Sequence, residues 1–355
     1  MINDLVLTVG NRQVVGWDEI RVTRGIERLP SDFSLSLMDY YPGSDEKQLV
    51  VPGEVCTVRI GGDLVMTGNI DRWNSVISKS RHEVRVTGRG RCRELVDCSA
   101  EWPNNVISQA NALQIAQKLA KPYGINVSSD IKEMTTVPQF TLNWGESPQE
   151  VLSRICRWAA MLFYDLPDGS LYMTRVGTSI AGSGVEQGVN IEDASFSSSM
   201  DERYSDYIGV SMSTNALYSD TGGYSSVTLA RAKDREVAKF GYRNRVVVVE
   251  STMNVNQLAQ SCIDWEMNRR YGRSQQLQVT VDSWRDKNGK LWEPNTLVPI
   301  KLPVFGLDDE LWLLSEVTFI RNGDEGTKAR MVLMPPQAFA VQPYSFYSQF
   351  PVLSQ

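Results

Sequence analysis

The chain contains two similar stretches, PGEVCTVRI at residues 52–60 and PNTLVPIKL at residues 294–302. Each stretch is a turn followed by an apolar strand that ends in a basic and then an aliphatic residue. A second match follows each of them, DLVMTGNI at residues 63–70 and ELWLLSEV at residues 310–317. A repeated strand–turn–strand unit indicates a duplicated β-domain, although two unrelated hairpins can also look alike by chance. We therefore expect two related antiparallel β-barrels.

The sequence around the first copy has the alternation of a β-domain. Apolar and polar residues alternate over residues 5–9, 33–37, 56–60 and 84–86, and clusters of Gly, Asp, Asn and Pro separate these runs. Several short strands divided by turn residues are typical of a barrel or sandwich.

The pattern changes to helical spacing after about residue 100. Residues 112–120 place apolar side chains on one helix face, and Gly124 follows as a stop signal. Ser147 begins a second helix, because Pro148 suits the first helical position and Glu150 completes a capping box. This segment is predicted to be a small α+β insertion.

The second half of the chain begins with polar, small residues. Residues 177–202 and 213–226 are predicted to be loops on either side of a short strand at 207–212. Apolar spacing from Val255 predicts a helix to about Tyr271, after which β structure resumes. The predicted domains are a first barrel (1–99), the insertion (100–176), a linker or β segment completing or bridging the barrels (177–252), a helix with the second barrel (253–340) and a tail (341–355). The fold class is α+β, dominated by β structure.

Composition excludes several classes of protein. The net charge of −6 argues against a general nucleic-acid binder, which needs a surplus of Lys and Arg. The chain shows neither a signal-peptide pattern nor an apolar run long enough to span a membrane, so we expect synthesis in the cytoplasm and no stable membrane insertion. Five scattered cysteines without CxxC spacing favour reduced thiols over disulfides or a zinc site.

Residues for catalysis are scarce. His82 is the one histidine, and no metal-binding spacing such as HExxH occurs. Asp308, Asp309 and Glu310 could suggest the paired acids of a glycosidase, but they follow a turn at Gly306, which favours a solvated loop. We expect no catalytic, cofactor-binding or metal-binding residues, and hence no enzyme.

Two features suggest assembly surfaces instead. Arginines at odd positions from Arg81 to Arg93 would share one face if the strand stayed extended, although a solvated face paired with Glu83 and Glu94 is an equal alternative. The C-terminal tail is aromatic, interrupted by proline, and could dock on a neighbouring subunit or on its own barrel. The candidate interface residues are Arg85, Arg89, Arg91 and Arg93 in the first feature and Tyr344, Phe346, Tyr347 and Phe350 in the second.

Several stretches resemble one known family, the baseplate hub proteins of contractile phage tails. The similarity is strongest to the hub of Mu-like phages, with late-control tail proteins and type VI spike proteins as more distant relatives. The matching stretches, in order, are GRGRCRELVD (88–97), NALQIAQKLAKPYGINV (111–127), WGESPQEVLSRICRWAAMLFYDLPDGSLYMTR (144–175), RYSDYIGVSM (203–212), NGKLWEPNTLVPIK (288–301) and PPQAF (335–339).

The resemblance implies a homotrimeric ring in the virion tail baseplate, with barrels similar in fold to tail-tube proteins. The ring would dock the hexameric tail tube on one side and a separate central spike protein on the other, beside further baseplate proteins. DNA would pass through its channel without sequence-specific binding, and no cofactor is implied. Two barrels in each of three chains would give six similar faces. The alternative is a tail-associated protein that binds or hydrolyses cell-wall glycans in the helical insertion.

Overall fold

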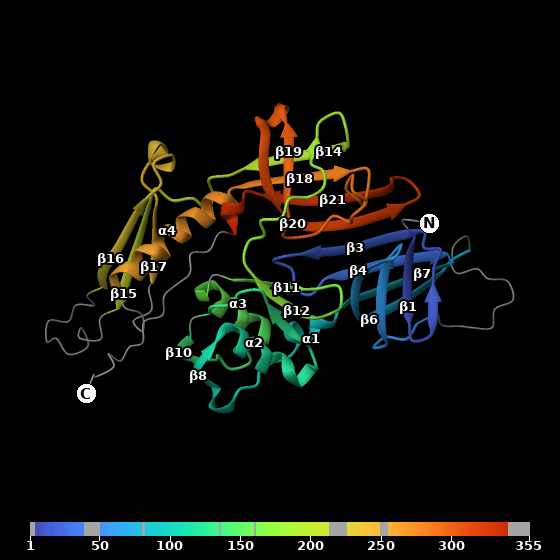
Figure 1. Ribbon diagram of the computed structural model, residues 1–355, viewed down its shortest axis with the longest axis horizontal. Helices are drawn as coiled ribbons and strands as arrows, with labels where there is room; N and C mark the ends of the chain where they lie inside the picture. Colours follow the sequence, from blue (N-terminus) through green and yellow to red (C-terminus); the bar gives the residue numbers. More distant parts are fainter. Residues whose placement is uncertain are drawn as a thin grey trace.

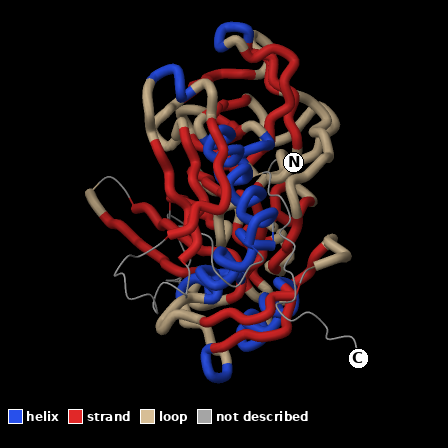
Figure 2. The backbone as a smooth tube through the Cα atoms, turned by 90° about the vertical axis from the view of Figure 1, so that its left-hand side faces the viewer, coloured by secondary structure: helices blue, strands red, loops and turns tan. Residues whose placement is uncertain are grey.

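The structure of the protein is a computed structural model that describes residues 4–38, 50–79, 82–134, 136–159, 161–212, 226–248 and 255–339. Strands make up most of its regular structure (Figure 1). Figure 2, with strands in red and helices in blue, shows the small helical share from the side. The predicted α+β class dominated by β structure is therefore confirmed.

One sheet of 13 strands forms the body of the molecule. Its first β-module consists of β1 (Leu5–Val9), β2 (Arg12–Val14), β3 (Glu19–Gly25), β4 (Asp32–Met38), β5 (Val55–Ile60), β6 (Asp63–Ile77) and β7 (His82–Gly90). Its second β-module consists of β13 (Val185–Glu186), β14 (Ile191–Ser198), β18 (Gln275–Val281), β19 (Leu297–Leu302), β20 (Leu307–Asn322) and β21 (Gly326–Met334). The apolar residues of both β-modules pack into one continuous core, because β20 pairs with β3.

The two β-modules repeat the same strand order. The order β5-β6-β7-β4-β3 in the first corresponds to β19-β20-β21-β18-β14 in the second. A β-bulge interrupts the register between Val58 and Arg59 in one copy, and between Ile300 and Lys301 in the other. Bulges are specific local features, so their recurrence at the same position of the repeat confirms the predicted duplication.

The register corrects one part of the predicted repeat. Ile60 pairs with Asp63 and Leu302 pairs with Leu307, so residues 63–70 correspond to 307–314 and not to 310–317. The similarity of letters in the two strands suggested the wrong offset. The true offset between the repeats is set by the hydrogen bonds between the strands and by the longer turn between β19 and β20.

The insertion lies below the sheet in Figure 1 and has its own apolar core. Its elements are α1 (Glu94–Asp97), β8 (Val106–Asn111), α2 (Ala112–Ala120), β9 (Val127–Ser129), β10 (Thr136–Thr141), α3 (Pro148–Ala159), β11 (Leu162–Asp165) and β12 (Leu171–Thr174). The predicted capping box is present, since Glu150 N donates to Ser147 Oγ at 3.3 Å and Ser147 N donates to Glu150 Oε2 at 2.8 Å. Asn111 and Gln114 form a second capping box that the sequence reading missed.

A small sheet at the left of Figure 1 completes the described chain. It contains β15 (Asp206–Met212), β16 (Ser226–Lys233) and β17 (Asn244–Val248), and α4 (Val255–Arg273) packs against β15 and β16. The helix predicted to end at about Tyr271 continues two residues farther, to Arg273. Residues 191–198, within a stretch predicted to be a loop, form β14, whose serine-rich composition concealed its alternation.

Candidate assembly surfaces

The junction between the two β-modules is a continuous strand pair within one chain. β3 and β20 run antiparallel, with Gly25 opposite Glu316 at one end and Ile20 opposite Arg321 at the other. On the polar side Thr318 Oγ1 and Thr23 Oγ1 lie 3.2 Å apart in a hydrogen bond. On the core side, Val22 and its partner Phe319 are fully buried. The junction therefore has both the hydrogen-bond ladder and the buried apolar side of an ordinary sheet interior.

Ion pairs reinforce this junction on the polar side. Arg28 Nη1 lies 3.4 Å from Glu316 Oε2 across the module boundary, and Arg28 also pairs with Asp32. Arg21 Nη2 lies 2.6 Å from Asp32 Oδ1. Such half-exposed pairs contribute little energy individually, so we attribute the stability of the junction mainly to the strand pairing and the core.

The candidate arginines do not share a single strand face. β7 ends at Gly90, and residues Arg91–Arg93 form a 3-10 helix, so Arg91 and Arg93 leave the strand that carries Arg85 and Arg89. A Cβ on Gly90 would lie 2.3 Å from Asp165 Oδ2, so the close approach of this carboxylate requires glycine at the end of the strand. The expectation of one extended arginine face is therefore wrong.

Three of these arginines pair within the chain. Arg85 Nη2 lies 2.8 Å from Glu19 Oε2, and Arg93 Nη1 lies 2.6 Å from Asp71 Oδ1. Arg89 joins Asp71 on β6 to Asp97 on α1, at 2.5 and 2.6 Å. The hydrogen bonds to Asp97 and Asp71 raise the pKa of Arg89, and the bond from Arg89 lowers the pKa of Asp97. Arg89 and Arg93 therefore brace the insertion against the first β-module.

A buried polar contact strengthens the same connection. Asp165, at the end of β11, accepts hydrogen bonds from Ser31 N at 3.0 Å and Ser31 Oγ at 2.8 Å. Burial raises the pKa of Asp165, while these bonds and the nearby Arg24 oppose the shift. No motif in the sequence identifies this contact, because its two sides are 134 residues apart.

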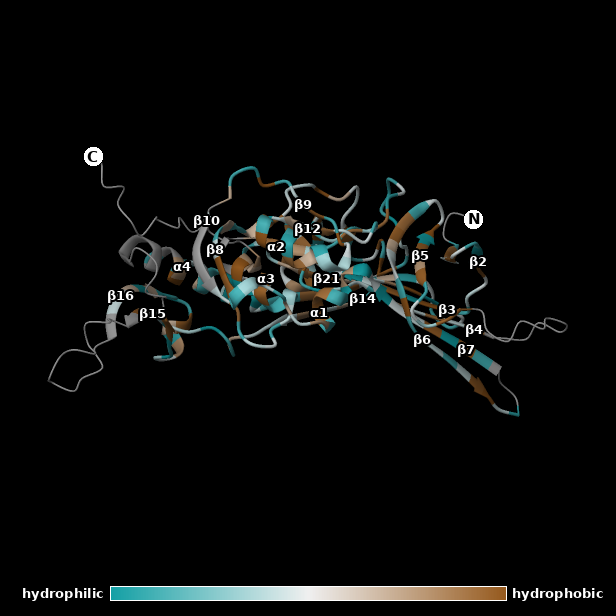
Figure 3. Cartoon of the chain, turned by 90° about the horizontal axis from the view of Figure 1, so that it is seen from below, coloured by the Kyte–Doolittle hydropathy of each residue, from teal (hydrophilic) through white to brown (hydrophobic). Residues whose placement is uncertain are grey.

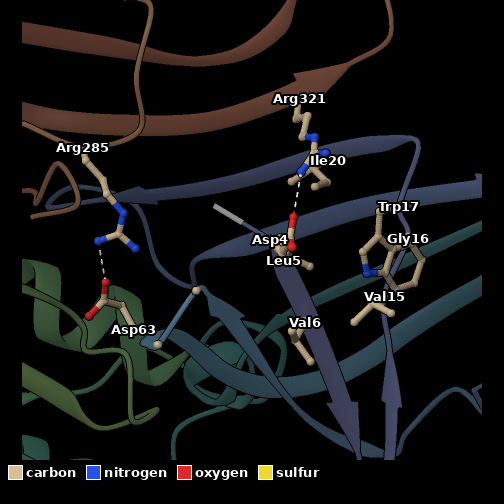
Figure 4. A pocket seen from close by; sticks show the side chains of 12 residues that line it. Asp4, Leu5, Val6, Val15, Gly16, Trp17, Ile20, Asp63, Arg285 and Arg321 are labelled. Carbon is tan, nitrogen blue, oxygen red and sulfur yellow. Dashed lines mark hydrogen bonds and ion pairs between the residues drawn. The ribbon is translucent and has the colours of Figure 1, made fainter. Parts of the chain in front are cut away.

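A cavity of about 900 Å³ lies at the rim of the module junction (Figure 4). Its first side comes from the start of β1 and the turn around Trp17, and its other side carries Arg285 and Arg321 of the second β-module. Arg285 Nη1 pairs with Asp63 at 2.6 Å, and Arg321 Nη1 lies 3.6 Å from Asp4. The cavity thus combines apolar walls with ion pairs between the two β-modules.

The remaining predicted residues lie apart from these surfaces. Asp308, Asp309 and Glu310 are exposed at the start of β20, outside the insertion to which the glycan alternative assigned a cleft. His82 is the first residue of β7. The aromatic residues Tyr344, Phe346, Tyr347 and Phe350 lie outside the described residues. Across the described ranges, no group of side chains could hold a metal ion, and no helix is long and apolar enough to cross a membrane.

Three sequence profiles match successive parts of the chain. Residues 4–90 match the N-terminal domain of the Mu phage baseplate assembly protein GpP-like family, which coincides with the first β-module. Residues 92–175 match the second domain of gp44-like baseplate hub proteins, and residues 255–342 match the fourth domain of the Mu phage baseplate assembly protein GpP.

Individual relatives give the same result. The chain is 31% identical over 347 residues to the baseplate hub protein gp44 of Escherichia phage Mu, covering 96% of this chain and 90% of that protein. The crystal structure of a 43 kDa tail protein from prophage MuSo2 of Shewanella oneidensis superposes with a TM-score of 0.84 at 29% identity, over 95% of this chain and 99% of that one.

A more distant likeness concerns the fold alone. A component of the type VI secretion system of E. coli, itself described as similar to the phage T4 tail proteins gp27 and gp5, superposes with a TM-score of 0.60 at 11% identity. The match covers 96% of this chain and 79% of that one. Together, the repeated β-modules, the profiles and the identity to the Mu protein show that the chain belongs to the Mu-type baseplate hub protein family.

Proposed function

We propose that the chain is the structural hub of a contractile tail baseplate and acts as a homotrimeric ring. One observation carries the proposal: a single chain holds two β-modules of the same strand order, fused into one sheet. A ring of three such chains presents six similar modules, so a three-fold assembly can match a six-fold partner through equivalent contacts. A tail tube is such a partner.

The partners follow from this geometry and from the family. The ring binds the tail-tube protein on one side and the central spike protein on the other, among other baseplate proteins of the virion. DNA passes through its channel without sequence-specific contacts, consistent with the net charge of −6. The function rests on assembly and not on catalysis. One observation supports this: the acids at 308–310 lie exposed at the start of β20, outside the insertion in which the glycan alternative would place a cleft.

Electron microscopy of the purified chain, mixed with the matching tail-tube and spike proteins, tests the proposal. The expected images show three-fold rings with a tube on one face and a spike on the other. Two controls are a mixture without the chain and a peptidoglycan turnover assay. Absence of rings in every mixture, or turnover abolished by one carboxylate substitution, would instead favour a glycan-processing tail protein.

A further inference from the structure

The repeat leaves two strand edges without a neighbouring strand among the described residues. β14 pairs with β18 on one side, and residues 72–77 of β6 pair with β7 on one side. The equivalent strands β3 and β20 are joined to each other within the chain. Figure 3 shows the β6–β7 hairpin extending beyond the body of the molecule. The open edges of β14 and β6 are therefore equivalent to the edges of β3 and β20, which pair with each other at the junction within the chain.

The hydrogen-bond registers fix which residues of the repeats are equivalent. A bulge lies between Ile70 and Arg72 of β6, and between Leu314 and Glu316 of β20, so Arg72 corresponds to Glu316. Counting along both strands, Asn74 corresponds to Thr318.

The same comparison shows that β14 in the second β-module is equivalent to β3 in the first. Asp32 of β4 pairs with Thr23 of β3, and the equivalent Gln276 of β18 pairs with Ser197 of β14. Ser197 therefore corresponds to Thr23. Thr23 and Thr318 pair with each other within one chain. Their equivalents, Ser197 and Asn74, do not pair with each other within one chain and are the predicted counterpart of this pair between two copies.

We propose that β14 of one copy pairs antiparallel with residues 72–77 of β6 in the next copy, with Ser197 opposite Asn74 and Ser195 opposite Val76. This inference rests on the proposed trimer and specifies its contact at the level of strand register. The contact is head-to-tail, so each chain offers one edge of each kind. A ring of three chains then closes with three such contacts and leaves neither edge open.

Burial of side chains supports this pairing. In β20, Ile320 at the junction with β3 is 9% exposed, whereas its equivalent in β6, Val76, is 56% exposed, and the next residue, Ile77, is 78% exposed. An exposed strand edge with aliphatic side chains and a single charge, Arg72, invites pairing with another strand, and proteins ordinarily block such edges. A second copy would bury Val76, as β3 buries Ile320 within the chain, and would satisfy the backbone groups of both edges.

Disulfide formation between introduced cysteines tests the register. Asn74→Cys and Ser197→Cys are combined in the full-length chain, because the equivalent side-chain oxygens of Thr318 and Thr23 lie 3.2 Å apart. A Thr23→Cys and Thr318→Cys chain is the positive control, and its disulfide forms within one chain. Asn74→Cys with Asp193→Cys is the matched negative control, because position 193 lies about 13 Å farther along the strand. The native chain with its five cysteines gives the background.

The expected result is a covalent trimer in most of the oxidised 74/197 protein, at least tenfold above the 74/193 and native chains. A trimeric mass without 74/197 crosslinks, in a preparation where the 23/318 control oxidises, would overturn the register and leave the trimer standing. A chain that stays monomeric, and therefore forms no crosslink, would overturn both the register and the proposed function.

Discussion

The second half of β6 and the second half of β20 occupy the same place in the repeat but have opposite environments. In β20, Val317 and Phe319 are fully buried because β3 lies beside them. In β6, most of the corresponding residues are exposed, and Val76 is 56% exposed where its equivalent in β20, Ile320, is 9% exposed. The difference shows that side chains in this half of the strand become buried only when another strand pairs beside it. The strand order within one module does not bury them.

The interiors of the two β-modules differ in a compensating way. Phe33 lies opposite Gly88 in the first, and the equivalent pair in the second is Leu277 and Leu333. One large and one very small side chain are thus replaced by two of middle size. The absence of a Cβ on Gly88 leaves room for the Phe33 ring, whereas the two leucines of the second β-module share the corresponding space.

The largest effect is expected at the closed junction. Phe319→Ala removes a fully buried ring that lies edge-on to Trp284, with 6.1 Å between ring centres. We expect the free energy of unfolding, measured by urea denaturation, to fall by about 3–5 kcal/mol. Val304→Ala, at a 66% exposed position, is the control and should change it by less than about 0.5 kcal/mol. Equal losses for both would contradict the buried junction.

A smaller effect is expected from exchanging the interior pairs. Gly88→Leu places a Cβ 2.6 Å from the Phe33 ring and 2.5 Å from Asn69 O, so we expect a loss of at least about 1–3 kcal/mol. Adding Phe33→Leu recreates the second module's pair and should recover about 0.5–3 kcal/mol of the loss in the same urea assay. If the changes in unfolding free energy caused by the two substitutions simply add, the Phe33–Gly88 and Leu277–Leu333 pairs are not equivalent.

The brace between the insertion and the first β-module should contribute less. Asp97→Asn removes the charge that pairs with Arg89, and because Asp97 is 46% exposed we expect a loss below about 1 kcal/mol. The folded pKa of Asp97 is lowered, so its stabilisation is present above the ordinary aspartate pKa and is lost as pH falls through the folded value. Melting temperatures of both proteins at pH 7 and pH 3 check this sign. A difference in melting temperature between the native and Asp97→Asn chains that is no smaller at pH 3 than at pH 7 would contradict the predicted pH dependence.

The smallest effect on folding is expected at the open edge. Ile77→Ser changes a side chain that is 78% exposed, so the unfolding free energy of the dilute single chain should shift by less than about 0.5 kcal/mol. Sedimentation velocity should nevertheless show weaker assembly, because Ile77 lies on the strand edge that the next copy pairs with in the proposed ring. Val304→Ser is a matched control on another exposed surface. Unaltered assembly in the Ile77 variant would argue against the open edge as a contact.

Local patterns in the sequence predicted the elements of the fold well. Alternation identified β1, β4, β5 and β7, and the capping box at Ser147 located the start of α3, because each signal depends on residues close together in the chain. The offset between the β6 and β20 repeats was wrong, since register depends on a turn length that letter similarity does not reveal. β14 was missed because serine carries no strong strand preference.

The assembly surfaces were less predictable than the fold. The spacing of the arginines predicted one charged strand face, but β7 ends at Gly90. Asp165 approaches the chain at this position, and the two residues are far apart in the sequence. The pairing of β3 with β20 likewise joins segments almost 300 residues apart. Such contacts follow from the folded topology, and no local motif encodes them.

The solution mass of the purified chain, measured by light scattering across a concentration series, tests the proposed hub most directly. We expect a plateau at the mass of three chains, with no larger plateau at higher concentration, because three head-to-tail contacts close the ring. A stable monomer at every concentration, or a mass that keeps growing as in an open filament, would contradict the closed trimer.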